Sequence, residues 1–292
     1  MELRKGMTQR LIALWLAGGA AGAHADFKMM GPVEATDGIR GWQQTLDANM
    51  RALKDAGQYP ASGYSECRET REVPGAFLCQ SDTPLTMNLA FVRASLYVEG
   101  DFGVPHGTVV RQDDPAFQKA LRRVAGNDLP GADLREFESA ARMACQTDSA
   151  RCLNAQETEM YRDVVGPLAQ STKPFVVISF GRKSFLTYNG VVSHETMHAQ
   201  YFLQPAYRSV ADDFWKNQMT EDQRMEIRNA LSGVYDAKNE LLMRNEFQAY
   251  MLMADAKSAH LGRYVSLYRG PLMDAMTKAG VIPVQVHRFE FD

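Results

Sequence analysis

The segment 194–198 of this chain holds His194, Glu195 and His198 in a His-Glu-x-x-His arrangement. In an α-helix, residues i and i+4 lie one above the other, so the two histidines can direct their ring nitrogens at one ion. Glu195 would stand beside that ion, where it can accept a proton from a water molecule that the metal activates. The chain has only six histidines, so the spacing specifically indicates a metal-dependent hydrolytic site.

The residues around this motif predict a strand, a short loop and a helix. Residues 174–180 have the sequence Pro-Phe-Val-Val-Ile-Ser-Phe, a β-branched and aromatic run of strand length. Residues 188–190 (Tyr-Asn-Gly) then supply a turn and a helix-start signal, and Pro205 is expected to end the motif helix. Apolar neighbours predict that this helix packs into a core: Val191, Val192, Met197, Ala199, Phe202 and Leu203.

A catalytic zinc site usually has three protein ligands and keeps one position for water or substrate. A long helical pattern covers residues 220–259, with Thr220 as the expected N-cap. Glu246 lies late in this pattern, and we expect it to be the third ligand. Further candidates for that place are Asp236, Glu240, Asp255 and His260.

Asn245, Glu246 and Ala249 carry a family resemblance. Residues 175–255 resemble the gluzincin metallopeptidases, in which His-Glu-x-x-His is followed on a later helix by Glu-x-x-Ala or Asn-Glu-x-x-x-Asp. The resemblance implies one Zn²⁺ ion held by Glu246 and the two motif histidines. A small residue at position 249 would let the two ligand helices approach closely.

Two further patterns bear on the subfamily. Tyr250 stands where the thermolysin-like pattern has the Asp that orients the first histidine, so the second partner of His194 stays open. Residues 199–204 contain no His, which excludes the metzincin arrangement. Gluzincin-like sites take an oxyanion donor from a region after the ligand helix, and we assign His260 and Tyr250 to this catalytic role. Arg263, Tyr264 and Tyr268 are further candidates.

The expected activity is peptide-bond hydrolysis by a zinc metallopeptidase. Glu195 would act as the general base and return the proton to the leaving amine. A strand over residues 176–179 would bind an extended peptide through main-chain hydrogen bonds, which favours a polypeptide or peptide substrate. Two alternatives are a zinc amidase acting on cell-wall peptides and a non-catalytic exported binding or interaction protein.

Residues 1–25 have the features of a secretory signal peptide. A basic start precedes an apolar run over residues 11–21 and small residues at 23–25, and we expect cleavage after Ala25. The apolar run is too short to span a membrane and no other stretch approaches the required length, so the mature chain should lack a membrane span. These features predict a periplasmic or secreted protein.

The four cysteines of an exported chain favour two disulfides. Three connectivities are possible, and we expect the local one. Cys67 with Cys79 would staple a hairpin or loop around Pro74 and Gly75. Cys145 with Cys152 would close a short loop between two helical segments.

Charge excludes some classes of partner. The net charge is -3, and removal of the signal segment would take away three basic residues (Arg4, Lys5 and Arg10) and one acidic residue (Glu2). A mildly acidic chain without a basic run has no electrostatic footprint for nucleic acid or for an anionic membrane surface.

A hydrophobic content of 45% allows a sizeable core. The patterns predict an α+β fold, mostly helical, in three parts: a signal peptide (1–25), an N-terminal disulfide-containing region (26–168) and a zincin-like catalytic region with a small sheet and two metal-ligand helices (169–292). Whether the N-terminal region lines the groove or acts as a propeptide stays open. Expected helices cover residues 42–56, 115–124, 134–144, 155–164 and 261–279; a strand-like or helical stretch covers 89–98, an edge strand begins at 174, a connection covers 210–215 and an extended tail covers 282–289.

Overall fold

The structure of this chain is a computed structural model. It describes residues 66–81, 83–171, 173–181, 188–254, 256–258 and 261–284. Within these residues the fold is α+β and mostly helical, as predicted, with one small mixed sheet. Several predictions fall outside the described residues: the signal segment, the helix over 42–56, the candidates Asp255 and His260, and the tail from 285.

Four strands form the sheet, in the order β1-β2-β4-β3. β1 (Glu66–Glu69) and β2 (Ala76–Ser81) make an antiparallel hairpin, and β2 pairs in parallel with β4 (Val176–Gly181). β3 (Gly126–Pro130) pairs antiparallel with β4 and forms the other edge. The sheet therefore joins β4 to strands that come from far earlier in the chain.

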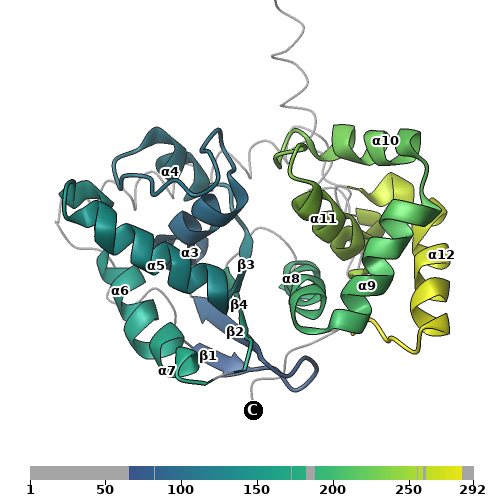
Figure 1. The fold of residues 1–292 in the computed structure, drawn as a ribbon, viewed down its shortest axis with the longest axis horizontal. Helices are drawn as coiled ribbons and strands as arrows, with labels where there is room; N and C mark the ends of the chain where they lie inside the picture. The colour runs from purple at the N-terminus through teal and green to yellow at the C-terminus, as the bar shows by residue number, and fades with distance from the viewer. Residues whose placement is uncertain are drawn as a thin grey trace, which may run out of the picture.

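β4 confirms the predicted strand but corrects its place. It lies in the interior of the sheet, so the prediction of an edge strand is wrong. All six of its residues are buried, because α3 and α5 lie on one side of the sheet and α8 on the other (Figure 1). Its main chain pairs with both neighbours, so the expected binding of a peptide along residues 176–179 is also wrong.

Helices fill the part of the chain around this sheet. They are α3 (Pro84–Glu99), α4 (Pro115–Ala120), α5 (Gly131–Cys145), a 3-10 turn (Ser149–Arg151), α6 (Ala155–Met160), a π-helical turn (Tyr161–Val165) and α7 (Gly166–Ala169). The helices predicted near 115–124, 134–144 and 155–164 are confirmed. The strand alternative for 89–98 is wrong, because these residues belong to α3, whose start is fixed by a capping box between Thr83 and Thr86. α3 is buried on nearly all sides, which hides the helical period in its sequence.

Both predicted disulfides are confirmed. Cys67 and Cys79 lie directly opposite each other in the β1-β2 pair, on either side of the turn at Gly75. Cys145 at the end of α5 bonds Cys152, just before α6. The first disulfide therefore links two strands of the sheet, and the second links the end of α5 to the segment before α6.

The rest of the described chain is helical. It contains α8 (Tyr188–Leu203), α9 (Pro205–Asp213), a π-helical turn (Phe214–Gln218), α10 (Glu221–Leu231), α11 (Glu240–Leu252), two 3-10 turns (Ala256–Ser258 and Gly262–Tyr264) and α12 (Val265–Lys278). α8 ends before Pro205 and α12 confirms the C-terminal helix, as predicted. The connection expected over 210–215 is wrong, because those residues continue α9 into the π-helical turn.

The single long helix expected over residues 220–259 is also wrong. Thr220 caps α10 as predicted, in a capping box with Gln223. A turn containing Gly233 then ends α10, and the Asn239 side chain accepts a hydrogen bond from Leu242 N (3.1 Å) to start α11. The break lets α11 take its own direction and pack against α8.

α8 lies between two hydrophobic cores (Figure 1). Val191 and Val192 pack into the core under the sheet, whereas Met197 and Tyr201 pack into the core formed by α9 to α12. The helix that carries the His-Glu-x-x-His motif is therefore fixed from both sides.

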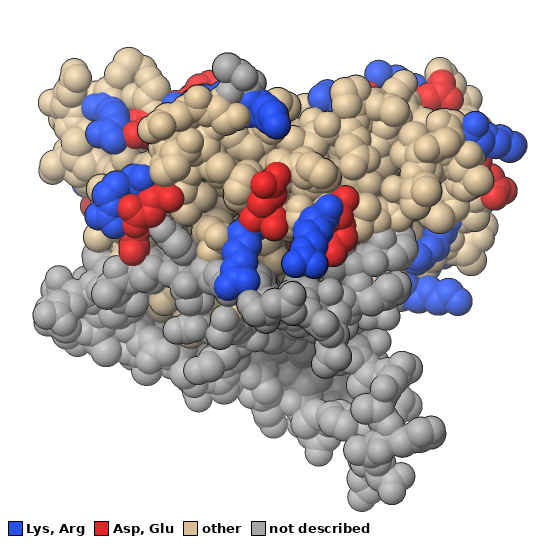
Figure 2. Space-filling view, turned by 90° about the horizontal axis from the view of Figure 1, so that it is seen from below, with Lys and Arg blue, Asp and Glu red and all other residues tan. Residues whose placement is uncertain are grey.

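The described surface carries charges of both signs. In the view of Figure 2, lysine and arginine side chains alternate with aspartate and glutamate, without a broad patch of one sign on the described part of that face. None of the described helices combines the length and the apolar character needed to cross a membrane.

Candidate metal centre

Three side chains converge where α8 packs against α11: His194, His198 and Glu246. The Nε2 atoms of the two histidines lie 3.0 Å apart. His194 Nε2 lies 3.3 Å from one carboxylate oxygen of Glu246, and His198 Nε2 lies 3.6 Å from the other. The structure thus brings together the three residues predicted to be metal ligands.

These distances suit one tetrahedral zinc ion. With zinc-ligand bonds of about 2.0–2.1 Å, neighbouring donor atoms of a tetrahedron lie about 3.3 Å apart. The three measured distances, 3.0, 3.3 and 3.6 Å, are each within about 0.3 Å of this value. Two imidazoles and one carboxylate are also a donor set that zinc accepts, and they leave a fourth position for water or substrate.

Both histidines are neutral at ordinary pH. Burial lowers the pKa of His194 to about 3 and that of His198 to about 4, and in His198 the charge of Glu246 opposes this fall. Their closeness to Glu246 is therefore not an ion pair. Neutral imidazoles present a free lone pair, which a metal ion requires.

Hydrogen bonds fix α11 against α8. The Gln248 side chain donates to Met197 O (3.4 Å) and accepts from the Tyr207 hydroxyl (2.5 Å). Ala254 N donates to the Ser193 hydroxyl oxygen (2.8 Å). These contacts flank the ligands on both helices, so the packing presets the distance between Glu246 and the histidines.

Glu195 points toward β3. Its carboxyl group hydrogen-bonds that of Asp128, and the two groups lie within 4.8 Å of a ring nitrogen of His198. Burial, followed by the charges of Glu246 and Glu99, raises the pKa of Glu195. Glu195, the residue expected to be the general base, thus lies beside the candidate metal ligands, where it could accept a proton from a water molecule bound there.

Further carboxylates surround the centre. Burial and the charge of Glu246 raise the pKa of Glu99 to about 8. Burial raises the pKa of Asp101 to about 6, and Lys119 opposes this while Asp236 adds to it. Among the residues that the structure describes, no lysine or arginine forms an ion pair with Glu99, Asp101, Asp128 or Glu195. A divalent cation bound here would favour the charged forms of these carboxyl groups.

Two tyrosines lie on the other side of His194. The ring centroids of Tyr250 and His194 are 4.5 Å apart, and the Tyr250 hydroxyl lies 3.2 Å from that of Tyr235. Burial and then the charge of Glu246 raise the pKa of both tyrosines, which keeps both hydroxyls protonated. Nδ1 of His194 has no hydrogen-bond partner among the described residues, and the Tyr250 ring packs against this imidazole.

The other candidates for the third ligand lie elsewhere. Glu240 accepts hydrogen bonds from Trp215 Nε1 (2.6 Å) and from Arg228 (2.8 Å), so its carboxylate is already used. Asp236 is exposed in the turn before α11 and is not among the grouped ligands. Neither residue replaces Glu246.

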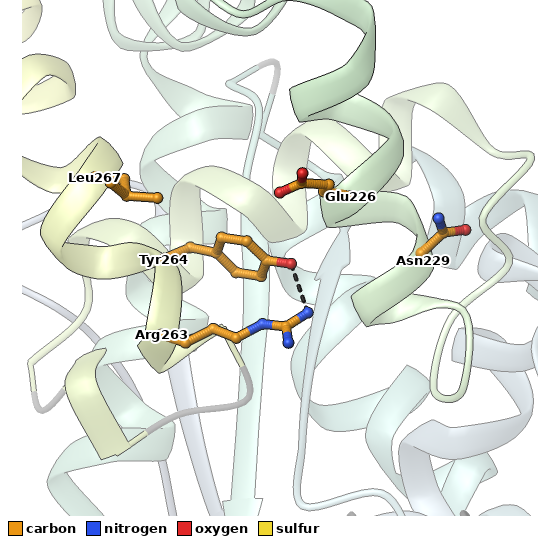
Figure 3. Close-up of a pocket in the computed structure, with 5 residues that line it drawn as sticks. All are labelled: Glu226, Asn229, Arg263, Tyr264 and Leu267. Atoms are coloured by element: carbon orange, nitrogen blue, oxygen red, sulfur yellow. Dashed lines mark hydrogen bonds between the residues drawn. The ribbon is translucent and has the colours of Figure 1, made fainter.

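A hollow of about 460 Å³ lies between α10 and α12 (Figure 3), and none of the grouped ligands lines it. Arg263 donates to the Tyr264 hydroxyl there (2.5 Å), and both residues line the hollow with Glu226, Asn229 and Leu267. Tyr268 packs against Phe247 in the core of the helical half. The three further oxyanion candidates, Arg263, Tyr264 and Tyr268, therefore make their contacts with residues other than the grouped ligands.

Five residues in or around this centre were not predicted from the sequence: Glu99, Asp101, Gly126, Asp128 and Tyr235. Gly126 and Asp128 belong to a Gly-Asn-Asp-Leu-Pro segment, whose composition is typical of a turn and not of a strand. Tyr235 lies in the turn between α10 and α11, and Glu99 at the end of α3. Only their spatial placement links them to the motif.

No family model, curated protein or solved structure matches this chain.

Proposed function

We propose that this chain is a zinc-dependent peptide hydrolase of the gluzincin type, with a zincin-like catalytic region. The observation that carries the proposal is the convergence of His194, His198 and Glu246 at distances that suit one tetrahedral ion, with Glu195 beside them. Bound zinc supplies a Lewis acid for the scissile carbonyl and lowers the pKa of a water molecule toward about 7.

Glu195 handles the proton in this proposal. Its carboxylate accepts a proton from the attacking water and then delivers it to the amine that leaves. Its exposed fraction is only 7%, so little bulk water competes for the proton. These two transfers require a carboxylate, which is why Glu195→Gln is the sharpest test of its role.

A peptide substrate would bind along β3, and not along β4 as the sequence suggested. β3 forms an edge of the described sheet and packs against α8, next to the motif. An extended peptide can pair with an open edge strand through main-chain hydrogen bonds. This arrangement would place a scissile bond near Glu195.

Tyr235 and Tyr250 supply hydroxyl donors on the opposite side of the ligands. Tyr250 is 5% exposed and packs on His194, whereas Tyr235 is less buried. We therefore assign the oxyanion hydrogen bond to Tyr235, with Tyr250 holding it through the bond between the two hydroxyls.

The compartment is part of the same proposal. Two disulfides in the described residues suit an oxidising environment, and residues 1–25 have the features of a signal peptide. We propose export to the periplasm or to the exterior of the cell.

Chelation and reconstitution test the function. The purified protein should hold about one zinc ion per chain and cleave quenched-fluorescent peptides. 1,10-Phenanthroline should abolish cleavage, and added zinc should restore it. A protein that binds zinc but cleaves no member of a broad peptide library would contradict the peptidase function.

A further inference from the structure

The edge strand β3 presses on the side of Glu195. A methyl group built on Gly126 would lie 2.5 Å from Glu195 Oε1 and 2.9 Å from Val191 Cγ1. Real side chains do not approach so closely, and only glycine leaves the carboxyl group its present place. The Glu195 carboxyl group therefore packs against the backbone of β3 at Gly126.

Asp128 contacts Glu195 from the same strand. Side chains two residues apart in a strand point to the same face, so Gly126 and Asp128 both face α8. The Asp128 and Glu195 carboxyl groups share a hydrogen bond. Ligand atoms of Asp128, Glu195 and His198 all lie within 4.8 Å of one another, so this contact lies beside the candidate metal ligands.

We propose that β3 positions Glu195, with Gly126 giving its carboxyl group room and Asp128 holding it by a hydrogen bond in its place beside the metal ligands. This inference rests on the proposed function. Gly126 and Asp128 are positioning residues, because the space at Gly126 and the side chain of Asp128 act on Glu195, whereas a substrate would pair with the main chain of β3.

The expected benefit of this arrangement is a fixed orientation. A glutamate side chain loses conformational freedom when it is held in one rotamer, and a buried hydrogen bond offsets part of this cost. A displacement of about 1 Å at a catalytic group can lower the rate about a hundredfold. Loss of either positioning residue should therefore lower kcat and leave KM and zinc affinity near their wild-type values.

Kinetics of four variants test the proposal. Asp128→Ala should lower kcat about 10- to 100-fold, whereas Asp128→Asn, which still donates a hydrogen bond, should stay within about fivefold of wild type. Gly126→Ala should lower kcat at least as much as Asp128→Ala. Gly233→Ala is the matched control, because a methyl group there meets nothing within 4 Å. Equal losses in the Asn and Ala variants of Asp128, or a wild-type kcat in Asp128→Ala, would overturn the inference.

A second measurement does not depend on activity. Carboxyl-carbon NMR of the zinc-free protein should show a Glu195 resonance, identified by its loss in Glu195→Gln, that shifts in Asp128→Ala and not in the exposed control Asp274→Ala. An unshifted resonance overturns the contact. If the wild type cleaves no peptide while this shift is present, the proposed function fails and the contact between Asp128 and Glu195 stands.

Discussion

Two buried carboxyl centres lie in the part of the chain that the structure describes, and they are compensated in different ways. Glu157, in the half that contains the sheet, is fully buried and pairs with Arg93 at 3.0 Å. It also accepts a hydrogen bond from Asn154 N (2.8 Å) in the capping box of α6. Arg93 in turn donates to Cys152 O and Arg151 O, which ties the centre to the second disulfide.

The other centre gathers Glu195, Glu246, Asp128 and Glu99 around two neutral histidines. These carboxyl groups lie among one another, and within the described ranges no arginine forms an ion pair with Glu99, Asp128 or Glu195 in the way that Arg93 does with Glu157. The carboxyl groups of the two centres are similarly buried, but their charges are compensated in different ways. The first centre is paired within the chain, whereas the second is where we propose that a zinc ion binds.

The largest effect should come from breaking the paired centre. Arg93→Met leaves the Glu157 carboxylate and two carbonyl groups buried without their donor, and should lower the free energy of unfolding by about 3–5 kcal/mol. Urea denaturation measures this loss. Arg142→Ala removes a more exposed ion pair with Glu138 and should cost less than about 1 kcal/mol. Similar losses in the two variants would contradict the contrast.

Zinc should act on the second centre alone. At a zinc concentration about a thousand times its Kd, the free energy of unfolding should rise by about 4 kcal/mol. Glu246→Gln removes a ligand and should abolish most of this gain, whereas Glu157→Gln should preserve it. Thermal melting with and without zinc provides the measurement, and equal gains in all three proteins would rule out this metal site.

The pH dependence of the free energy of unfolding tests the centre that contains Glu157. Burial raises its pKa from 4.5 to about 7, although Arg93 opposes this. The folded state then keeps a proton that the unfolded state has lost, so its contribution to stability is greatest below pH 4.5 and falls as pH rises toward 7. Between pH 5 and 8 the zinc-free wild type should lose roughly 2–3 kcal/mol relative to Glu157→Gln. Parallel pH curves for the two proteins would contradict this.

The smallest effect concerns the outer carboxylates. The charge of Glu246 raises the pKa of Glu99, so the two groups interact through space. Glu99→Gln should weaken zinc binding about two- to fivefold, equivalent to about 0.4–1 kcal/mol, because it removes a carboxyl group whose charged form zinc would favour, without removing a ligand. Competition with a chromophoric chelator gives the Kd. Asp274→Gln, on the exposed face of α12, should leave it unchanged.

The features that the sequence predicted are local ones. The spacing of His194 and His198 follows from the helical period, and the short separations within the two cysteine pairs favoured the observed disulfides. Glu246 could be predicted because it also lies on a helix, where Asn245, Glu246 and Ala249 have the spacing typical of a known family. Each of these features depends on residues that are near in the chain or on one repeating geometry.

The features that the sequence missed are long-range ones. A run of apolar residues predicted β4 but not its neighbours, because pairing with β2 and β3 joins distant segments. Asp128 meets Glu195 through the packing of β3 against α8, which also joins distant segments, so no spacing reveals this contact. The break between α10 and α11 was missed because its signals, Gly233 and Asn239, are also tolerated inside helices.

The most direct measurement of the central claim is the rate of peptide hydrolysis per bound zinc in Glu195→Gln. The substitution preserves the size of the side chain and all three grouped ligands, so the variant should hold the same zinc as wild type. Hydrolysis should fall by about 10²- to 10⁴-fold, because an amide cannot accept the proton. A zinc-loaded Glu195→Gln protein that cleaves peptides at a near wild-type rate would contradict the role assigned to Glu195 and, with it, the proposed mechanism.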